Sequence, residues 1–283
     1  MTDKNRRFFY NLYMAAFLLY LLVPLAVMSG AAFNDSKLPS IYPWMGLTDR
    51  WFIDLWNDDT LWTSFRNTIL VALAVVVLAV PIGTAAAIVV NSISGRTRSV
   101  LYGVMVAPIL APGAVIGIST ILFWNKLHVP TGLHLSALGQ VSYIAAFVML
   151  LVLARLQSFD TNLEEAALDL GATHPQVLRR VLLPHLYPAI GAGAAIAFFQ
   201  SIENFNITLF TRGTSNTLTV YVFSKVRSGI TPSINALAFL LIVTTLGLAI
   251  IYEWRRRARV KVEAAREAEA RRAEAEAELN LIP

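Results

Sequence analysis

One carboxylate lies at the end of a long apolar stretch of the sequence. Glu203 follows the uncharged run 181–202, and Asn204 comes directly after it. Further polar side chains lie close by in the sequence: Ser201, Asn206 and Thr208. An ionisable group within a membrane span costs about 2.5–3.5 kcal/mol even on the lenient scale, so it marks a functional position by default. We expect Glu203 and Asn204 to line a path through the membrane, where a carboxylate with nearby amides could bind an ammonium group. The alternative is that Glu203 caps a bent helix or pairs with an arginine.

Two prolines interrupt a second apolar stretch, the run 99–125. Pro108 and Pro112 lie in its middle, and Gly113 and Gly117 follow. Such residues free backbone carbonyl groups, which a membrane tolerates only against protein or a water-lined cavity. We therefore expect a gate or hinge at Pro108 and Pro112, with a packing kink as the alternative.

The residues required for common enzymatic chemistry are missing from the sequence. It contains no cysteine, which excludes disulfides, thiolate metal sites and a cysteine nucleophile. It also lacks the G-x-x-x-x-G-K-[ST] phosphate loop, so we do not expect the chain to hydrolyse ATP. No Ser–His–Asp set or pair of carboxylates is evident, and the four histidines lack the spacing of metal ligands. We expect neither catalytic residues nor a bound metal or cofactor.

The segment 158–184 has the pattern of two short helices. Thr161 precedes Glu164 by three residues, which predicts a capping box at the start of the first helix. Gly171 is placed where a left-handed residue would end that helix. The helix between them has one apolar face, made of Leu163, Ala166, Ala167 and Leu170. An apolar face on an exposed loop needs a partner to cover it.

The second short helix repeats these signals. Thr173 and Gln176 form another capping pattern, and Pro175 falls in the first turn, where its missing N–H costs nothing. Pro184 marks the entry to the next span. An interfacial loop that serves only its own protein is the alternative reading of this segment.

The elements that position these residues are membrane-spanning helices. Hydrophobic residues make up 56% of the chain and charged residues 14%, whereas a soluble domain carries about 25% charged residues. The uncharged runs each reach the roughly 20 residues that a helix needs to cross a bilayer. These runs are 8–34, 67–95, 99–125, 127–154, 181–202 and 228–252. We therefore predict an all-α membrane protein with six transmembrane helices.

The distribution of Lys and Arg predicts the orientation. Placing the N-terminus inside puts more basic residues on the cytoplasmic segments than on the outer ones, as the positive-inside rule requires. We expect a cytoplasmic N-terminus over residues 1–9, a six-helix membrane domain over 10–253 and a charged cytoplasmic tail over 254–283. The segment 158–184 then lies in the cytoplasm, between the fourth and fifth spans.

The first outer loop is rich in tryptophan: Trp44, Trp51, Trp56 and Trp62. Because indole rings favour the membrane–water interface, we expect these residues to anchor the loop on the outer surface. Contact with a ligand is the alternative.

The order of residues in the cytoplasmic segment resembles the EAA signature of binding-protein-dependent ABC importer permeases. Glu165-Ala166-Ala167 is followed after three residues by Gly171, and after nine more by Val181-Leu182-Leu183-Pro184. The family pattern is E-A-A, three residues, G, nine residues, I-x-L-P, and only Val181 departs from it. The resemblance covers residues 10 to 253, with the transmembrane core of the family at about 64–253.

Several stretches are similar to the second permease subunit of spermidine/putrescine importers: 33–36, 107–112, 156–184 and 226–238. Importers of opines, aminophosphonates, thiamine and iron belong to the wider similar group. The resemblance implies a small cationic, polyamine-like solute, with these other solutes as alternatives.

The resemblance also implies partners and a mechanism. In this family the segment carrying Glu165, Ala166, Ala167 and Gly171 is a coupling helix that docks on an ATPase subunit. The chain would sit in the bacterial inner membrane beside a second, homologous permease subunit. Two cytoplasmic ATPase subunits would bind ATP and Mg²⁺, and a soluble binding protein would deliver the solute for alternating access.

Two other classes of protein remain as alternatives. An ion-coupled secondary transporter would show inverted repeats and several intramembrane charges. A membrane enzyme would show ionisable residues clustered at one depth. The sequence offers one strong intramembrane candidate and no evident repeat.

Overall fold

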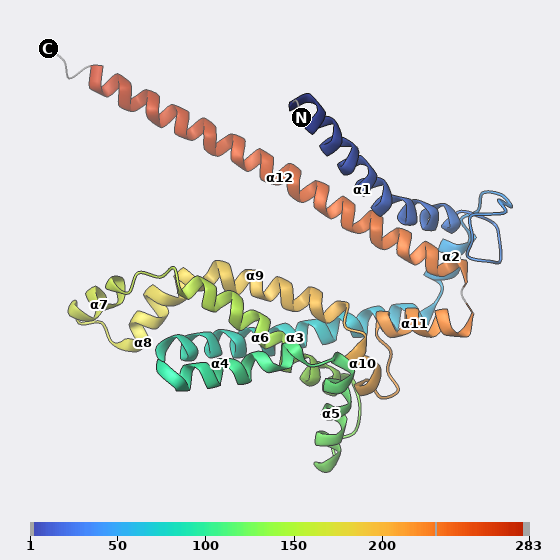
Figure 1. Cartoon of the computed structure of the whole chain (residues 1–283), viewed down its shortest axis with the longest axis horizontal. Coiled ribbons are helices and arrows are strands. Elements are labelled where there is room, and N and C mark those ends of the chain that lie inside the picture. The colour runs from blue at the N-terminus through green and yellow to red at the C-terminus, as the bar shows by residue number, and fades with distance from the viewer. Residues whose placement is uncertain (1–2, 230, 280–283) are drawn as a thin grey trace. The chain divides into compact units, whose positions relative to one another are not determined.

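The computed structural model describes residues 3–229 and 231–279, and the side chains of residues 5–229 and 231–260 (Figure 1). Helices account for most of these residues. The described part contains no strand, only an isolated antiparallel bridge between Asn34 and Leu47. The all-α prediction is therefore confirmed for this part of the chain. The chain divides into two compact units, Asp58–Ser228 and Met1–Asn57 together with Gly229–Pro283.

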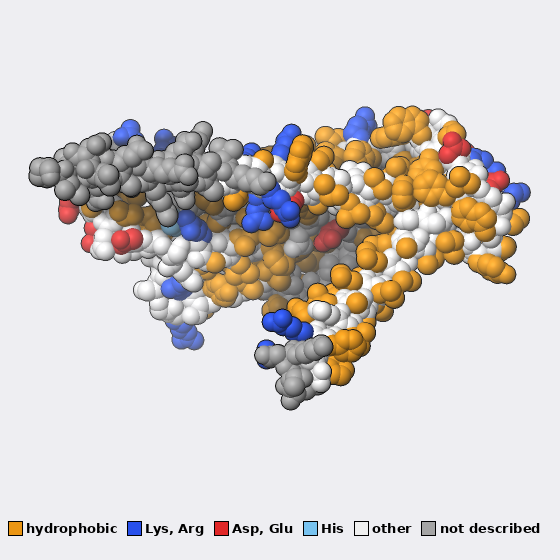
Figure 2. Space-filling view, turned by 90° about the horizontal axis from the view of Figure 1, so that it is seen from above, with side chains coloured by type: hydrophobic (Ala, Val, Ile, Leu, Met, Phe, Trp, Pro, Cys, Tyr) orange, Lys and Arg blue, Asp and Glu red, His pale blue; other side chains and the backbone are white. Residues whose placement is uncertain are grey.

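Five helices of the described residues are long and apolar enough to cross a membrane, or six if one bent pair counts as a single span. The five are Asn5–Ala32, Asp59–Ser92, Leu133–Leu156, His174–Ile202 and Pro232–Val260. Hydrophobic side chains cover long stretches of the helix surfaces in the face that Figure 2 shows. Such a surface suits contact with lipid rather than water.

Three helices form the core of the unit Asp58–Ser228: α3 (Asp59–Ser92), α6 (Leu133–Leu156) and α9 (Leu183–Ile202). Gly83 of α3 allows the closest approach, because a Cβ there would lie 2.5 Å from the carbonyl oxygen of Ala145 and 2.7 Å from Cβ of Val148. Small residues at helix contacts are typical of membrane bundles. Val148 also packs against Gly193 of α9, so it lies between two glycines.

The third predicted span is broken. Residues 99–125 belong to α4 (Gly95–Leu110) and α5 (Gly113–Lys126), which are bent by 106° at the break. Ala111 and Pro112 are extended, with ψ of 134° and 133°. The residue before a proline is pushed away from the helical region, and Pro112 has no N–H to continue the helix. The interruption that Pro108 and Pro112 predict is therefore present, and the pair counts as the sixth span only if the two bent helices are taken together.

Two further short helices of this unit pack beside the core. The first, α10 (Asn206–Thr211), packs on α5 and α6, and the second, α11 (Leu218–Ser228), packs on α3. The glycines of α5 allow α10 to pack closely, because a Cβ at Gly117 would lie only 3.2 Å from the backbone of Ile207.

The other unit is built from α1 (Asp3–Ala32), α2 (Arg50–Trp56) and α12 (Pro232–Leu279). Both α1 and α2 pack on α12. Phe33, Phe52 and Phe239 form an aromatic cluster with ring centroids 5.0 to 5.8 Å apart. The backbone of α12 is helical through the predicted tail boundary at residue 254 as far as Leu279, while the side chains of 261–283 lie outside the described residues.

Trp51 does not have the role that the sequence predicts. Its side chain is buried, and its indole nitrogen donates a hydrogen bond to the carbonyl oxygen of Asn34 at 2.8 Å. The prediction of interfacial anchoring is therefore wrong for Trp51. Trp44, Trp56 and Trp62 have exposed side chains, and their anchoring stays a prediction.

Candidate functional site

A cavity of about 330 Å³ lies where the break between α4 and α5 meets the end of α9. Glu203 is the residue at the C-terminal cap of α9, and both Glu203 and Asn204 line the cavity. Pro108 lines it from α4, and Pro112 lies in the break between two residues that line it. The full lining is Pro108, Ile109, Ala111, Gly113, Ile116, Tyr143, Phe147, Gln200 and residues 203–207. The structure thus brings together the residues that the sequence predicts for the path and for the gate.

The polar side of the cavity is held by hydrogen bonds around Asn204. Its Nδ2 donates to the hydroxyl oxygen of Tyr143 at 2.9 Å, and its Oδ1 accepts from the backbone N–H of Ile207 at 3.2 Å. The hydroxyl of Tyr143 donates in turn to Oε1 of Gln200 at 3.4 Å. The carboxylate of Glu203 is exposed and has no hydrogen-bond or ion-pair partner among the described residues. It therefore remains free to bind a cation.

A second polar network holds α9 and α10 against α6. The side chain of Gln140 is fully buried: its Oε1 accepts from Oγ of Ser201 at 2.6 Å, and its Nε2 donates to Oγ1 of Thr208 at 2.9 Å. Ser136 and Thr211 are hydrogen-bonded at 2.9 Å. Because a buried polar group without a partner is costly, these bonds fix the helix ends that carry Glu203 and Asn204.

Sequence reasoning missed Ser136, Gln140 and Tyr143. All three lie within an uncharged run, and their spacing of four and then three residues places them on one face of a helix. That spacing is a signal that could have identified the polar face of α6.

The predicted coupling segment contains α7 (Asn162–Asp169). Gly171 has φ of +85°, as predicted for the residue after a helix end. Its N–H bonds the carbonyl oxygen of Leu168 at 2.8 Å, and the N–H of Ala172 bonds that of Ala167 at 3.0 Å, which together make a Schellman motif. The predicted cap at the other end was wrong. Thr161 makes no side-chain cap, and Oδ1 of Asp160 instead accepts from the N–H of Asn162 at 3.0 Å.

Much of the surface of α7 is exposed. Leu170 has 89% of its side chain exposed and Leu163 has 54%. Glu165 and Ala166 are exposed, and Ala167 is half-buried. The predicted apolar face is therefore uncovered in this chain alone.

The second short helix is not separate from the following span. It begins as α8 (His174–Val177), with the predicted capping box of Thr173 and Gln176, and it widens into the π-helical turn η1 (Leu178–Leu182). It then continues as α9 without a break. Pro184 has no N–H to donate to the preceding turn, which favours the wider turn before it. The second short helix is thus present at the predicted place, but it continues directly into the following span.

This continuous helix joins the two candidate sites. It runs from His174 to Ile202 over 29 residues, which is about 43 Å at 1.5 Å per residue. One end contacts α7, and the other end leads to Glu203 and the cavity (Figure 1).

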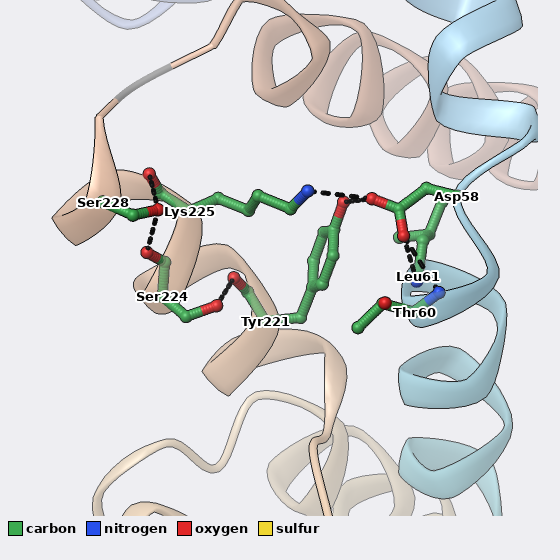
Figure 3. A network of polar contacts seen from close by, with 7 residues as sticks. All are labelled: Asp58, Thr60, Leu61, Tyr221, Ser224, Lys225 and Ser228. Atoms are coloured by element: carbon green, nitrogen blue, oxygen red, sulfur yellow. Dashed lines mark hydrogen bonds and ion pairs between the residues drawn. The ribbon is translucent and has the colours of Figure 1, made fainter.

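Asp58 links α3 to α11 in a further network (Figure 3). One carboxylate oxygen caps α3 by accepting from the N–H groups of Thr60 and Leu61 at 2.9 and 3.1 Å. The other accepts from the hydroxyl of Tyr221 at 2.8 Å and from Nζ of Lys225 at 2.9 Å. Burial raises the pKa of the Asp58 carboxyl, but the hydrogen bonds from Lys225, Tyr221 and Leu61 outweigh it, so the net pKa is below the ordinary value. Burial and the bond to Asp58 raise the pKa of Tyr221.

Replacing Asp58 with asparagine tests this link. Asparagine retains a capping oxygen but loses the charge that pairs with Lys225, so we expect a destabilisation of about 1 kcal/mol at neutral pH. Because the pKa of Asp58 is lowered by folding, its stabilising contribution is present above the ordinary carboxyl pKa of 3.8 and is lost as the pH falls through the lower folded-state value. Thermal unfolding in detergent between neutral pH and about pH 3 measures the effect.

The matched control is Asp59→Asn, which alters the exposed neighbouring carboxylate in the first turn of α3 and should lower the midpoint less than Asp58→Asn does. Equal midpoints for Asp58→Asn and the parent chain at neutral pH would contradict the link. A difference in midpoint between Asp58→Asn and the parent chain that stays the same at low pH would also contradict it.

Comparison with known proteins gives one family. The family described as binding-protein-dependent transport system inner membrane component matches residues 79–259. This range contains α7, the cavity and the helix that joins them.

Curated relatives match most of the chain. The spermidine/putrescine transport system permease protein PotC of Haemophilus influenzae is 28% identical over 250 residues, covering 88% of this chain and 96% of its own. The putrescine transport system permease protein PotI of Escherichia coli K12 is 32% identical over 243 residues, covering 83% of this chain and 85% of its own.

The fold is also similar to a solved structure. A bacterial alginate ABC transporter, in complex with a periplasmic protein bound to an alginate pentasaccharide, matches with a TM-score of 0.68 and 15% identity. The match covers 88% of this chain and 93% of the transporter chain. At this identity the similarity shows the fold alone.

Proposed function

Because the chain belongs to the family of binding-protein-dependent transport system inner membrane components, we propose that it is the permease subunit of an ATP-driven importer for a small cationic, polyamine-like solute. The solute enters the cytoplasm by alternating access. The observation that carries this proposal is the continuous helix His174–Ile202, which joins the exposed helix α7 to the cavity at Glu203.

The solute class is supported by the relatives and by the cavity. PotC and PotI are permease proteins of spermidine/putrescine and putrescine transport systems. The free carboxylate of Glu203 lies beside the amides of Asn204 and Gln200, and the rings of Tyr143 and Phe147 complete the wall. A carboxylate attracts an ammonium group, and aromatic faces attract cations.

The proposed gate is the break between α4 and α5. Pro108 and Pro112 flank the point at which the two helices bend, and the residues of the break line the cavity. A helix end free of continuous hydrogen bonds can change direction at a few backbone dihedral angles. Movement of α4 against α5 then opens or closes the cavity.

The proposed partners are supported by the family and, for the ATPase subunit, by the exposed surface of α7. Two ATPase subunits hold ATP and Mg²⁺, and one of them docks on Glu165, Ala166, Ala167 and Gly171. A second permease subunit completes the path, and a soluble binding protein delivers the solute, as the alginate transporter complex has a periplasmic protein bound. This chain itself binds no cofactor and does not hydrolyse ATP.

ATP-dependent uptake of putrescine into proteoliposomes that contain the assembled transporter tests the proposal. Uptake that follows an ion gradient and needs no ATP would favour a secondary transporter instead. Uptake of an opine, an aminophosphonate, thiamine or iron in place of putrescine would retain the importer and overturn the solute class.

A further inference from the structure

The loop of residues 33–49, here named the Asn34 loop, is ordered around one buried side chain. Nδ2 of Asn34 donates to the carbonyl oxygens of Ser40 and Pro43, both at 2.9 Å, and its Oδ1 accepts from the N–H of Met45 at 2.8 Å. The N–H of Asp35 bonds the carbonyl oxygen of Gly46 at 2.9 Å, which closes the base of the loop. Asn34 is fully buried, so these bonds form away from competing water.

This ordered loop exposes large apolar side chains. Tyr42 is 83% exposed, Leu47 is 79% exposed and Met45 is 66% exposed. Leu38 and Trp44 are exposed beside them. An exposed apolar surface held in a fixed conformation indicates contact with a partner or a membrane.

The geometry of the loop favours the membrane. The bridge between Asn34 and Leu47 holds Leu47 level with Asn34, two residues beyond the end of α1 at Ala32. The side chains of α1 in the preceding turns, such as Val23 and Val27, are exposed, as lipid contact requires. The loop covers the last turn of α1, where residues 28–34 are half-buried or buried, and Leu47 lies at the depth where the apolar run ends.

The charges at the base of the loop are consistent with this position. Arg50 pairs with Asp35 at 3.6 Å, and its guanidinium also lies 4.2 Å from the centre of the Trp51 ring. The pair neutralises the two charges next to Leu47. Tyrosine and tryptophan side chains, with an apolar ring and one polar atom, favour the headgroup region.

We propose that the Asn34 loop is an interfacial anchor that inserts Tyr42, Met45 and Leu47 into the phospholipid leaflet at the C-terminal end of α1. Asn34 is the positioning residue, because its side chain holds the loop in the conformation that presents all three. The anchor fixes the depth of α1 in the bilayer, independently of the solute and of ATP.

Single-cysteine spin labelling of the full chain in phospholipid nanodiscs tests the proposal. The chain contains no cysteine, so Tyr42→Cys and Leu47→Cys each give one labelled site. Leu22→Cys on α1 is the lipid control, and Lys37→Cys in the same loop is the water control. We expect labels at 42 and 47 to collide several-fold less with an aqueous nickel chelate than the label at 37. Their collisions with oxygen should approach those at 22.

Equal nickel accessibility at 42, 47 and 37 would overturn the proposal. Protection of 42 and 47 that appears only when a binding protein is added would identify a protein-docking surface instead.

A second variant tests the role of Asn34. Asn34→Asp retains the oxygen that accepts from Met45 and loses both donated hydrogen bonds, so the label at 47 should become mobile and accessible to nickel. Unchanged mobility and nickel accessibility of the label at 47 in the folded Asn34→Asp variant would overturn that role. If this variant does not fold, the labels at 42 and 47 in the chain with Asn34 still decide the membrane contact.

Discussion

Replacing Glu165 with arginine, or Gly171 with proline, should reduce ATP-driven uptake by roughly ten- to hundredfold while the chain still inserts into the membrane. Glu165→Arg reverses an exposed charge on the surface that we propose for the ATPase subunit. Gly171→Pro is incompatible with φ of +85°, because proline fixes φ near −65°. It also removes the N–H that bonds Leu168. Uptake and ATPase rates of the reconstituted transporter measure both effects.

Glu164→Arg is the matched control for the charge, since Glu164 is the neighbouring carboxylate of the same helix, lies about 100° around it from Glu165 and is outside the predicted docking residues. It should retain most of the uptake. Normal uptake by Glu165→Arg, or an equal loss in both arginine variants, would contradict a specific docking role for Glu165. Membrane insertion is checked by the amount of full-length chain in the purified membrane fraction.

Replacing Glu203 with glutamine should reduce putrescine uptake by roughly 10- to 100-fold, because a hydrogen bond to a charged group contributes about 1.5–3 kcal/mol. Glutamine has nearly the same shape and retains a polar side chain, so the loss isolates the charge. The carboxylate lies in the cavity without a partner among the described residues, and nothing else there supplies a formal negative charge. Initial uptake rates over a range of putrescine concentrations measure the effect.

Glu203→Asp retains the charge and should recover much of the uptake, whereas Asp59→Asn removes a carboxylate outside the cavity and should have no effect. Basal ATPase activity should remain in all three variants, because none alters α7. Unchanged putrescine uptake by Glu203→Gln would show that the path does not depend on this carboxylate.

The sequence predicts the helices well, because long uncharged runs have few structural solutions in a membrane. It also predicts the left-handed residue Gly171 and the capping box of Thr173 and Gln176, which are local features. The 106° bend between α4 and α5 lies at Ala111 and Pro112, and α10 packs against the glycines of α5 just beyond it. That contact is distant in sequence, so prolines indicate a break but not its angle.

The site was predicted only in part, because it too depends on contacts between residues that are distant in sequence. Glu203 and Pro108 are recognisable in the sequence as an isolated acid and a helix interruption. That both line one cavity follows only from the tertiary structure. Asp160 replaces the predicted cap Thr161 because two neighbouring residues can both supply a capping oxygen. The burial of Trp51 depends on its hydrogen bond to the carbonyl oxygen of Asn34. This residue lies seventeen positions earlier in the sequence, and the fold of the loop brings it close.

Uptake of radiolabelled putrescine into proteoliposomes tests the central claim most directly. The assembled transporter contains this chain, its partner permease and the ATPase subunits, with the loaded binding protein outside and ATP inside. We predict accumulation of putrescine that requires internal ATP and the binding protein, and that is lost with Glu165→Arg. Accumulation driven by an ion gradient in the absence of ATP, and unaffected by Glu165→Arg, would contradict the account.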